Sequence, residues 1–297
     1  MVKIILGGLP MWFGGDMRPV VAIAQAAERA GIDSLLVTDH VVMGENLDAY
    51  PYGPFPMPPE DPWYEPLISL AVIAGATSRL RLATGVLVSP LRSAVLLAKQ
   101  IATLDALSGG RLDIGVGVGW QKEEYDACGV PFEDRFARLE DQVRVWRLLW
   151  SEAPASYHSP FTSFERIYCR PAPVQAGGVP VWFGVAPQPK NIARMAELAD
   201  GWMPMEQDPS KLAEPIARIR AAVAAAGRDP AAFKVRATLR VAERDGKPDL
   251  EASFAEAAVL VAIGVTHIEV RPPRFLPTPE GLEPFLERLV ALRDGLA

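Results

Sequence analysis

Short apolar runs of strand type alternate with longer amphipathic runs along almost the whole chain. In each longer run, apolar side chains recur every three or four positions, the spacing that gathers them on one face of a helix. Strands are predicted at residues 2–6, 34–38, 80–88, 111–118, 179–184, 199–203, 233–241 and 266–271. Helices are predicted at about 17–31, 66–77, 92–107, 134–150, 190–199, 212–227, 251–263 and 282–292.

Eight strand–helix pairs predict an α/β fold. The 297 residues divided by eight leave about 37 residues for each pair, which is the size of one strand–helix unit of a barrel. Strands that alternate with helices form a parallel sheet, and eight of them close into a (β/α)8 TIM barrel. A doubly wound open sheet is the alternative, but such sheets usually carry fewer strands. We therefore predict a single barrel domain over residues 1–297.

Two connections are too long to be simple turns. Residues 41–65 follow the second strand and are rich in proline, and residues 151–178 follow the fourth helix. Insertions of this length inside a compact domain usually act as lids or binding loops. The first leaves the C-terminal end of its strand, which is the end where barrel enzymes place their active sites.

Composition and charge exclude several classes of protein. Hydrophobic residues make up 49% and charged residues 22% of the chain, as in ordinary globular proteins. Thirty basic against 36 acidic residues give a net charge of −6, which predicts no nucleic-acid partner. The two cysteines cannot build a disulfide framework, and no cluster of His and Cys predicts a bound metal.

The apolar runs are too short for export or for crossing a membrane. The first run ends at residue 6. A signal peptide needs a longer run, of roughly 7–15 apolar residues after a basic start. The longest later run, residues 67–76, is far below the roughly 18 residues of a membrane helix. We expect a cytoplasmic protein without a membrane partner.

His40 is the leading candidate for a catalytic side chain. It follows the second strand, on the face where barrel enzymes place their active sites. An imidazole there titrates near neutral pH and could donate or accept a proton. The structural alternative is a hydrogen bond to the barrel rim, with Asp39 as a solvated cap. His158, in the second long insertion, and His267, near the start of strand eight, are expected to be structural.

Two glycine-rich strand segments could let a flat ligand approach the backbone. Residues 115–119 read Gly-Val-Gly-Val-Gly, which is not the spacing of a dinucleotide-binding motif. Residues 84–86 read Thr-Gly-Val, where a bulge in strand three is expected. Close packing inside the barrel is the alternative for both segments.

Aromatic side chains and one loop complete the candidate site. Tryptophans near strand ends suit a planar, partly apolar ligand, although buried packing is their commoner use. These are Trp12, Trp63, Trp120 and Trp182. Residues 184–188, which read Gly-Val-Ala-Pro-Gln, join strand five to its helix, whose N-terminal amides could hold an anion.

Several of these segments resemble the bacterial luciferase-like family. They are 36–40 (Leu-Val-Thr-Asp-His), 81–88, 99–105, 107–112 (Leu-Ser-Gly-Gly-Arg-Leu), 115–120 (Gly-Val-Gly-Val-Gly-Trp) and 199–202. The resemblance runs from the first strand to at least Trp202. It is strongest to the branch of coenzyme F420-dependent oxidoreductases.

The resemblance implies a barrel that binds a deazaflavin or flavin at its C-terminal mouth. It implies a cis peptide bond between Gly85 and Val86 behind the cofactor ring, and a position for His40 near the reactive face. The implied cofactor contacts are Asp39, Gly85, Val86, Val88, Val118, Gly119, Gly184, Val185, Ala186, Pro187 and Gln188. The substrate pocket is expected to be lined by Trp12, Trp63 and Trp120. Relatives commonly form dimers, so a homodimer is expected.

The chain departs from the family pattern at two places. Sugar-phosphate dehydrogenases of this superfamily carry a catalytic Glu after the strand-four glycines, where this chain has Trp120. This difference argues against an activity of the glucose-6-phosphate type. The phosphate-side loop is often Gly-Gly followed by a small polar residue, whereas residues 184–187 here offer fewer hydroxyl donors.

The leading hypothesis is an F420-dependent oxidoreductase. It would transfer a hydride between the deazaflavin and a small organic substrate, with His40 supplying or taking the accompanying proton. An FMN-dependent monooxygenase on the same fold is the first alternative, because a flavin activates oxygen whereas a deazaflavin carries hydride. A non-catalytic flavin-binding barrel is the second alternative.

Overall fold

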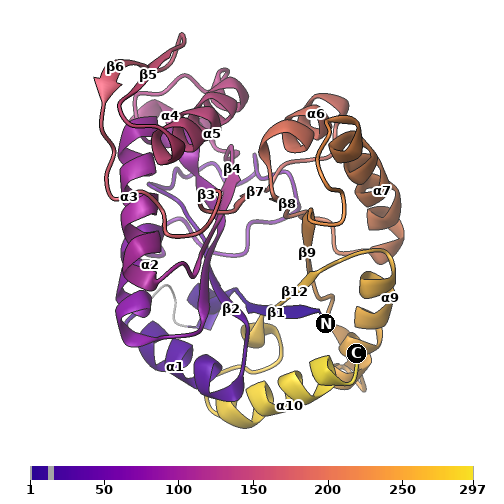
Figure 1. Cartoon of the computed structure of the whole chain (residues 1–297). Coiled ribbons are helices and arrows are strands. Elements are labelled where there is room, and N and C mark those ends of the chain that lie inside the picture. Colours follow the sequence, from indigo (N-terminus) through magenta and orange to yellow (C-terminus); the bar gives the residue numbers. More distant parts are fainter. Residues whose placement is uncertain (1, 13–16, 297) are drawn as a thin grey trace.

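The predicted strands form the closed barrel that their alternation with helices indicates. The computed structural model describes residues 2–12 and 17–296. The strand order around the barrel is β1-β12-β9-β8-β7-β4-β3-β2, and each neighbouring pair is parallel. Helices surround the sheet on its outer side (Figure 1). The (β/α)8 prediction is therefore confirmed.

The barrel elements lie close to their predicted ranges. The strands are β1 (Lys3–Leu6), β2 (Ser34–Val37), β3 (Arg81–Val88), β4 (Leu112–Gly117), β7 (Val181–Phe183), β8 (Gly201–Trp202), β9 (Lys234–Thr238) and β12 (His267–Val270). The helices that follow are α1 (Val20–Ala30), α2 (Pro66–Ala76), α3 (Ala94–Ser108), α5 (Arg135–Ser151), α6 (Pro189–Leu198), α7 (Pro209–Ala225), α8 (Leu250–Ala255), α9 (Ala257–Ala262) and α10 (Leu282–Asp294).

Three features differ from the sequence-based expectation. A short helix, α4 (Lys122–Ala127), follows β4 before α5 begins. The helix expected at 251–263 is divided into α8 and α9, with Glu256 between them. Two hairpins stand outside the barrel: β5 (Ala155–His158) with β6 (Ser163–Ile167), and β10 (Ala242–Arg244) with β11 (Lys247–Asp249). The first of them occupies the second long insertion.

The ends of α3 show how local sequence sets an element. Ser93 lies just before the helix, and its hydroxyl accepts a hydrogen bond from the backbone N–H of Leu96, as expected of a capping serine. Gly109 ends the helix with φ of 68°, a left-handed conformation that glycine adopts without a Cβ clash. These two residues fix where α3 begins and ends before the chain enters β4.

Two apolar layers hold the barrel together. The larger lies between sheet and helices and includes the fully buried Trp146, Phe183 and Trp202. The smaller fills the inside of the barrel and is called the interior plug below. Its members are Ile5, Leu36, Ala83, Trp182 and Met203, with Val86 packed against them.

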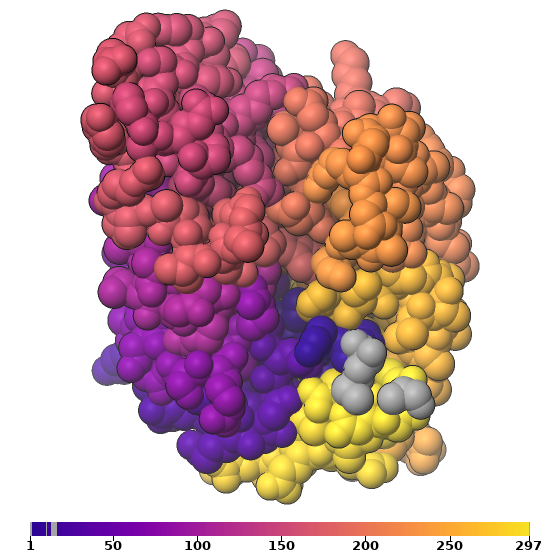
Figure 2. Space-filling model, in the orientation of Figure 1, coloured from indigo at the N-terminus to yellow at the C-terminus, as the bar shows by residue number. Residues whose placement is uncertain are grey.

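The two ends of the chain meet where the barrel closes. β1 pairs with β12 along its whole length, from Lys3 opposite His267 to Leu6 opposite Val270. The indigo N-terminal and yellow C-terminal segments lie side by side in the space-filling view (Figure 2). Among the helices of the described residues, none is both long enough and apolar enough to cross a membrane.

Candidate active site

The structure places His40 at the C-terminal mouth of the barrel, three residues after β2 ends. Its side chain is buried, and Nδ1 lies 3.2 Å from Oε2 of Glu124, a fully buried carboxylate on α4. The other carboxylate oxygen accepts a hydrogen bond from the backbone N–H of Val41 at 2.6 Å. Glu124 thus fixes both the imidazole and the first residue of the long insertion.

The carboxylate also bears on which nitrogen of His40 carries the proton. A carboxylate beside Nδ1 favours the tautomer that donates from Nδ1. Nε2 then carries the lone pair, and no described residue lies within hydrogen-bonding distance of it. The arrangement leaves one imidazole nitrogen available to exchange a proton with a ligand.

An aromatic cluster surrounds His40. The rings of Trp63, Phe55 and Trp120 meet the imidazole edge to face, with centroid distances of 4.7, 5.9 and 6.0 Å. Tyr50 packs against both Phe55 and Trp120. Nε1 of Trp63 is buried and has no hydrogen-bond partner among the described residues. The long insertion therefore supplies an apolar wall with one unused donor.

Trp12, the third predicted pocket residue, lies at another part of the mouth. Its indole N–H donates to the carbonyl of Leu276, in the segment after β12, at 2.7 Å. Trp182, by contrast, is buried in the interior plug. The structure thus brings Trp63 and Trp120 to His40, while the pocket role of all three predicted residues stays a prediction.

Asp39 is turned towards the protein. Its two oxygens accept hydrogen bonds from the guanidinium of Arg92 at 2.7 and 2.9 Å, and one also accepts the backbone N–H of Val88 at 2.8 Å. Arg92 also reaches Glu65 at 3.3 Å. Burial lowers the pKa of Arg92, but the hydrogen bond and the charge of Asp39 raise it by more. This network ties the second strand, the third strand and the end of the long insertion together.

The third strand carries the predicted irregularity. The peptide bond between Gly85 and Val86 is cis, and the register with β4 shifts between Thr84 and Leu87. Both the cis bond that the resemblance implies and the bulge that the sequence suggests are confirmed. Gly85 and Val86 are partly exposed.

Glycines around Val86 make room for its side chain. A Cβ at Gly117 would lie 2.6 Å from Cγ2 of Val86, and a Cβ at Gly184 would lie 2.4 Å from Cγ1. Contacts this short do not occur between real side chains. At these two positions, close packing explains the glycine. A contact with a bound ring at Gly184 stays a prediction.

The remaining predicted strand-four residues hold α4 in place. The carbonyl of Val118 accepts the hydroxyl of Tyr125 at 2.6 Å. Gly119 has φ of 63°, and a Cβ there would lie 2.9 Å from Cγ1 of Val88. These contacts position the helix that carries Glu124.

A cavity of about 230 Å³ opens at the ends of β7 and β8. Its wall includes Gly184, Val185, Ala186, Pro187, Tyr52, Trp202, Met203 and Lys211. The loop is held by Trp202 Nε1, which donates to the carbonyl of Val185, and by Asn191 Nδ2, which donates to that of Ala186, both at 2.9 Å. Gln188 does not line it, and its backbone N–H donates to Ala186. Since Tyr52 belongs to the long insertion, that insertion reaches from His40 across the mouth.

Sequence reasoning missed Glu124 and the aromatic partners Phe55 and Tyr50. Two adjacent glutamates after the strand-four glycines were the available signal, because a short helix there turns one of them inward. Nothing in the sequence of the proline-rich insertion indicates which of its aromatic side chains folds back onto His40.

The chain is similar to proteins of one known family. The family model described as luciferase-like monooxygenase matches residues 9–281. An uncharacterised protein of Mycobacterium tuberculosis is 36% identical over 212 residues, which are 70% of this chain and 74% of that protein.

Two further relatives use different cofactors. The FMNH2-dependent dimethylsulfone monooxygenase of Pseudomonas putida is 27% identical over 79% of this chain and 60% of its own length. The structure of the coenzyme F420-dependent tetrahydromethanopterin reductase from Methanopyrus kandleri superposes with a TM-score of 0.71 at 18% identity, and the match covers 96% of each chain. At that identity the superposition shows the shared fold.

Proposed function

The chain belongs to the luciferase-like monooxygenase family, and we propose that within it the protein is a coenzyme F420-dependent oxidoreductase. The reaction would move a hydride between the deazaflavin and a small organic substrate, while His40 moves the accompanying proton. The observation that carries the proposal is the pairing of His40 with Glu124 at the mouth, 3.2 Å apart and both buried. A buried carboxylate beside an imidazole is an arrangement suited to reversible proton transfer.

The residues at the mouth fit a flat ring that carries an anionic tail. The partly exposed Gly85 and Val86 offer a surface without long side chains beside the aromatic cluster. The ring would rest there, and its tail would extend towards the cavity at the ends of β7 and β8. Lys211 lines that cavity beside Glu206, whose Oε2 lies 3.7 Å from its Nζ, and it would turn from that carboxylate to the negative charge of the tail. When bound, the deazaflavin would supply the hydride carrier.

The side chains of the protein would move the proton, orient the imidazole and exclude water. Nε2 of His40 would hold or release the proton, and Glu124 would keep Nδ1 protonated and fix the ring orientation. The aromatic cluster of Phe55, Trp63 and Trp120 would exclude water from the reacting carbon and select partly apolar substrates. Asp39 would act through Arg92 and Val88 by holding the strand ends, and a direct cofactor contact would require it to leave them.

An FMN-dependent monooxygenase is the second candidate. The Pseudomonas putida relative favours it, because that protein is described as FMNH2-dependent and shares 27% identity over 79% of this chain. In that case the mouth would hold FMN, and His40 would serve the oxygen chemistry. The predicted homodimer and cytoplasmic location stay predictions under either candidate.

A pair of assays on the full chain separates the two candidates. The first follows F420 absorbance without oxygen while reduced or oxidised cofactor is offered to enones, imines and secondary alcohols. The second follows oxygen uptake with reduced FMN and the same compounds. Turnover in the first assay alone supports the proposal, turnover in the second alone replaces it with the monooxygenase, and inactivity in both favours a non-catalytic flavin-binding barrel.

A further inference from the structure

One carboxylate inside the barrel serves two arginines. Glu269 of β12 forms an ion pair with Arg236 of β9, and its Oε1 accepts a hydrogen bond from Nε of Arg271, just after β12, at 2.7 Å. The side chains of Arg236 and Glu269 are 4% and 2% exposed. Among the residues that the structure describes, no other acidic side chain pairs with either guanidinium. The cluster therefore carries one positive charge in excess.

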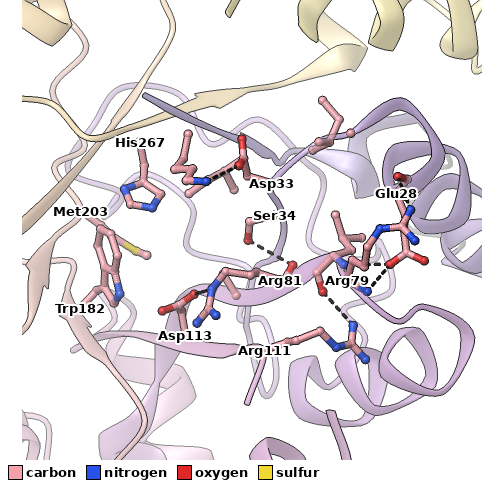
Figure 3. Close-up of a pocket in the computed structure, with 16 residues that line it drawn as sticks. Glu28, Asp33, Ser34, Arg79, Arg81, Arg111, Asp113, Trp182, Met203 and His267 are labelled. Carbon is pink, nitrogen blue, oxygen red and sulfur yellow. Dashed lines mark hydrogen bonds and ion pairs between the residues drawn. The ribbon is translucent and has the colours of Figure 1, made fainter. Parts of the chain in front are cut away.

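The opposite end of the barrel pairs its buried acid differently. A cavity of about 420 Å³ lies there, at the N-terminal ends of the strands, and is lined by Arg81, Asp113 and His267 (Figure 3). Arg81 lies 2.7 Å from Asp113. This pairing of one acid with one base leaves no arginine over, whereas at Glu269 one of the two arginines is left over.

Two glycines hold the cluster at the end of the strands. A Cβ at Gly7 would lie 2.5 Å from Oε1 of Glu269, and a Cβ at Gly8 would lie 3.2 Å from both Cβ and Cγ of Arg271. Gly8 also has φ of 70°, which glycine adopts without a Cβ clash. The backbone after β1 therefore lies directly against the carboxylate and the aliphatic stem of Arg271, and it keeps that stem at the mouth.

The outer end of Arg271 is not used within the described part of the chain. Its Nε donates to Glu269, but neither Nη1 nor Nη2 donates to a described residue. The side chain is 26% exposed, so water reaches this end. The two N–H groups that point outwards from the end of a planar guanidinium match the spacing of the two oxygens of a carboxylate.

Tyr50 connects Arg271 with the aromatic cluster. Burial raises the pKa of Tyr50 and the charge of Arg271 lowers it, which requires the two side chains to lie near each other. The ring of Tyr50 packs against Phe55 and Trp120, with centroids 5.0 and 5.3 Å apart, and both of those rings meet His40. The excess charge thus lies beside the aromatic wall of the proposed substrate pocket.

An apolar ligand at this wall would displace water from the outer end of Arg271. Taking a guanidinium out of water without giving it a partner is costly. A ligand with a single negative charge avoids this cost, because it neutralises the excess charge of the cluster. A dianion such as a phosphate monoester would exceed that charge.

We propose that the substrate is a small organic acid, with a carboxylate that Arg271 binds through Nη1 and Nη2 and an apolar body that lies against the aromatic cluster. Glu269 and Arg236 hold the guanidinium in place and do not touch the ligand. This inference rests on the proposed function, because it assigns the substrate class of the same site.

The test compares cinnamate with cinnamamide, its neutral analogue of the same shape. Both are titrated into the purified full chain by calorimetry, with and without F420. We expect cinnamate to bind about 10–100-fold more tightly than cinnamamide at pH 7, as a hydrogen-bonded charge pair predicts. Equal affinities overturn the proposal, even where a variant fails to fold. Since this measurement needs neither turnover nor bound F420, the proposed function can fail separately.

Variants locate the contact. Arg271→Gln is expected to weaken cinnamate binding by about 10–100-fold and to leave cinnamamide binding unchanged. Arg271→Lys keeps the charge without the planar pair of donors, so its loss should be smaller. Arg274→Gln is the matched control, because it removes an exposed arginine three positions later. Equal losses in Arg274→Gln and Arg271→Gln would show a response to net charge alone and overturn the proposal.

A titration of the same variants with F420 separates the substrate from the cofactor tail, which is also anionic. The tail is expected at the ends of β7 and β8, so Arg271→Gln should bind F420 as tightly as the unmodified chain. A loss of F420 affinity with an unchanged preference for cinnamate would assign Arg271 to the tail and overturn the proposal. Failure of the unmodified chain to bind F420 would contradict the proposed function and leave the comparison of cinnamate with cinnamamide to decide this one.

Discussion

The two ends of the barrel hold their polar groups in different ways. At the base, which is the N-terminal end of the barrel strands, ion pairs join neighbouring strands directly. Arg81 on β3 pairs in this way with Asp113 on β4. At the mouth, the principal contact joins His40, after β2, to Glu124, on a helix 84 positions later in the chain. The base is thus built from the sheet itself, whereas the mouth is assembled by segments that leave the sheet.

Because of this difference, substitutions at the two ends should have different effects. The register of the barrel fixes the partners at the base, so a substitution there acts first on stability. The contacts at the mouth depend on the long insertion and on α4, which do not belong to the barrel ladder. A substitution there can alter chemistry while the barrel stays intact.

His40→Gln is expected to have the largest effect. The change removes the imidazole at the mouth while the barrel contacts remain, so turnover falls by about 10²–10⁴-fold. Thermal unfolding and cofactor binding are expected to stay close to those of the unmodified chain. The measurement is steady-state turnover alongside a cofactor titration, and full turnover with normal cofactor binding would remove His40 from the proton transfer.

Glu124→Gln is expected to reduce turnover by about 10–100-fold, because a charged hydrogen bond of about 1.5–3 kcal/mol to His40 is replaced by a neutral one. The measurement is steady-state turnover alongside thermal unfolding and the cofactor titration. Turnover equal to that of the unmodified chain would remove Glu124 from the proton transfer, and a loss of turnover that only follows a loss of folded protein would leave it a purely structural role.

Gly184→Ala tests the packing at the mouth. A Cβ there would lie 2.4 Å from Val86, so the free energy of unfolding should fall by about 1–3 kcal/mol. Gly75→Ala is the matched control, since it lies near the end of α2 with no atom within 4 Å of the added Cβ. Urea unfolding compares the two, and an unaffected Gly184→Ala would show that Val86 can move aside.

The base should show its effect in the pH dependence of stability. The pKa of His267 is about 4 when folded, against 6.5 for a free imidazole, so the unfolded chain binds the proton more readily. Stability therefore falls as the pH drops from 6.5 towards 4. Between pH 7 and pH 5 this ring contributes a loss of up to about 2 kcal/mol.

The control for that pH effect is His267→Phe. The variant should lose less stability than the unmodified chain between pH 7 and pH 5, as measured by urea unfolding at each pH. Equal losses in the two proteins would mean that His267 is not buried in its neutral form. Turnover at neutral pH should be unaffected, because the ring lies beyond the interior plug from His40.

The sequence predicted the barrel well because each strand and helix carries its own periodic pattern. It also predicted the position of His40 at the mouth, from its place after β2, and the cis bond at Gly85, from the family resemblance, while the catalytic role of His40 stays a prediction. Glu124 was missed because α4 has only six residues, too few to show a period. The cavity at the base was missed because its side chains stand alone at strand starts, where His267 was expected to be structural.

The mouth was predictable only in part for a related reason. Trp63 and Trp120 were singled out as aromatic residues near strand ends, but their contact with His40 depends on how residues 41–65 fold back. That path is set by Gln121, whose amide exchanges hydrogen bonds with the backbone of Gly44 at 2.8 and 3.0 Å. Such contacts between distant segments leave no periodic trace in the sequence.

The most direct measurement is a paired titration of the purified apoprotein with F420 and with FMN, followed by cofactor fluorescence or by calorimetry. We expect tight binding of F420 and weak binding of FMN, with both affinities unchanged in His40→Gln. Tight binding of FMN with weak binding of F420 would contradict it in favour of the monooxygenase. Binding of neither would contradict the assignment of the mouth as a cofactor site.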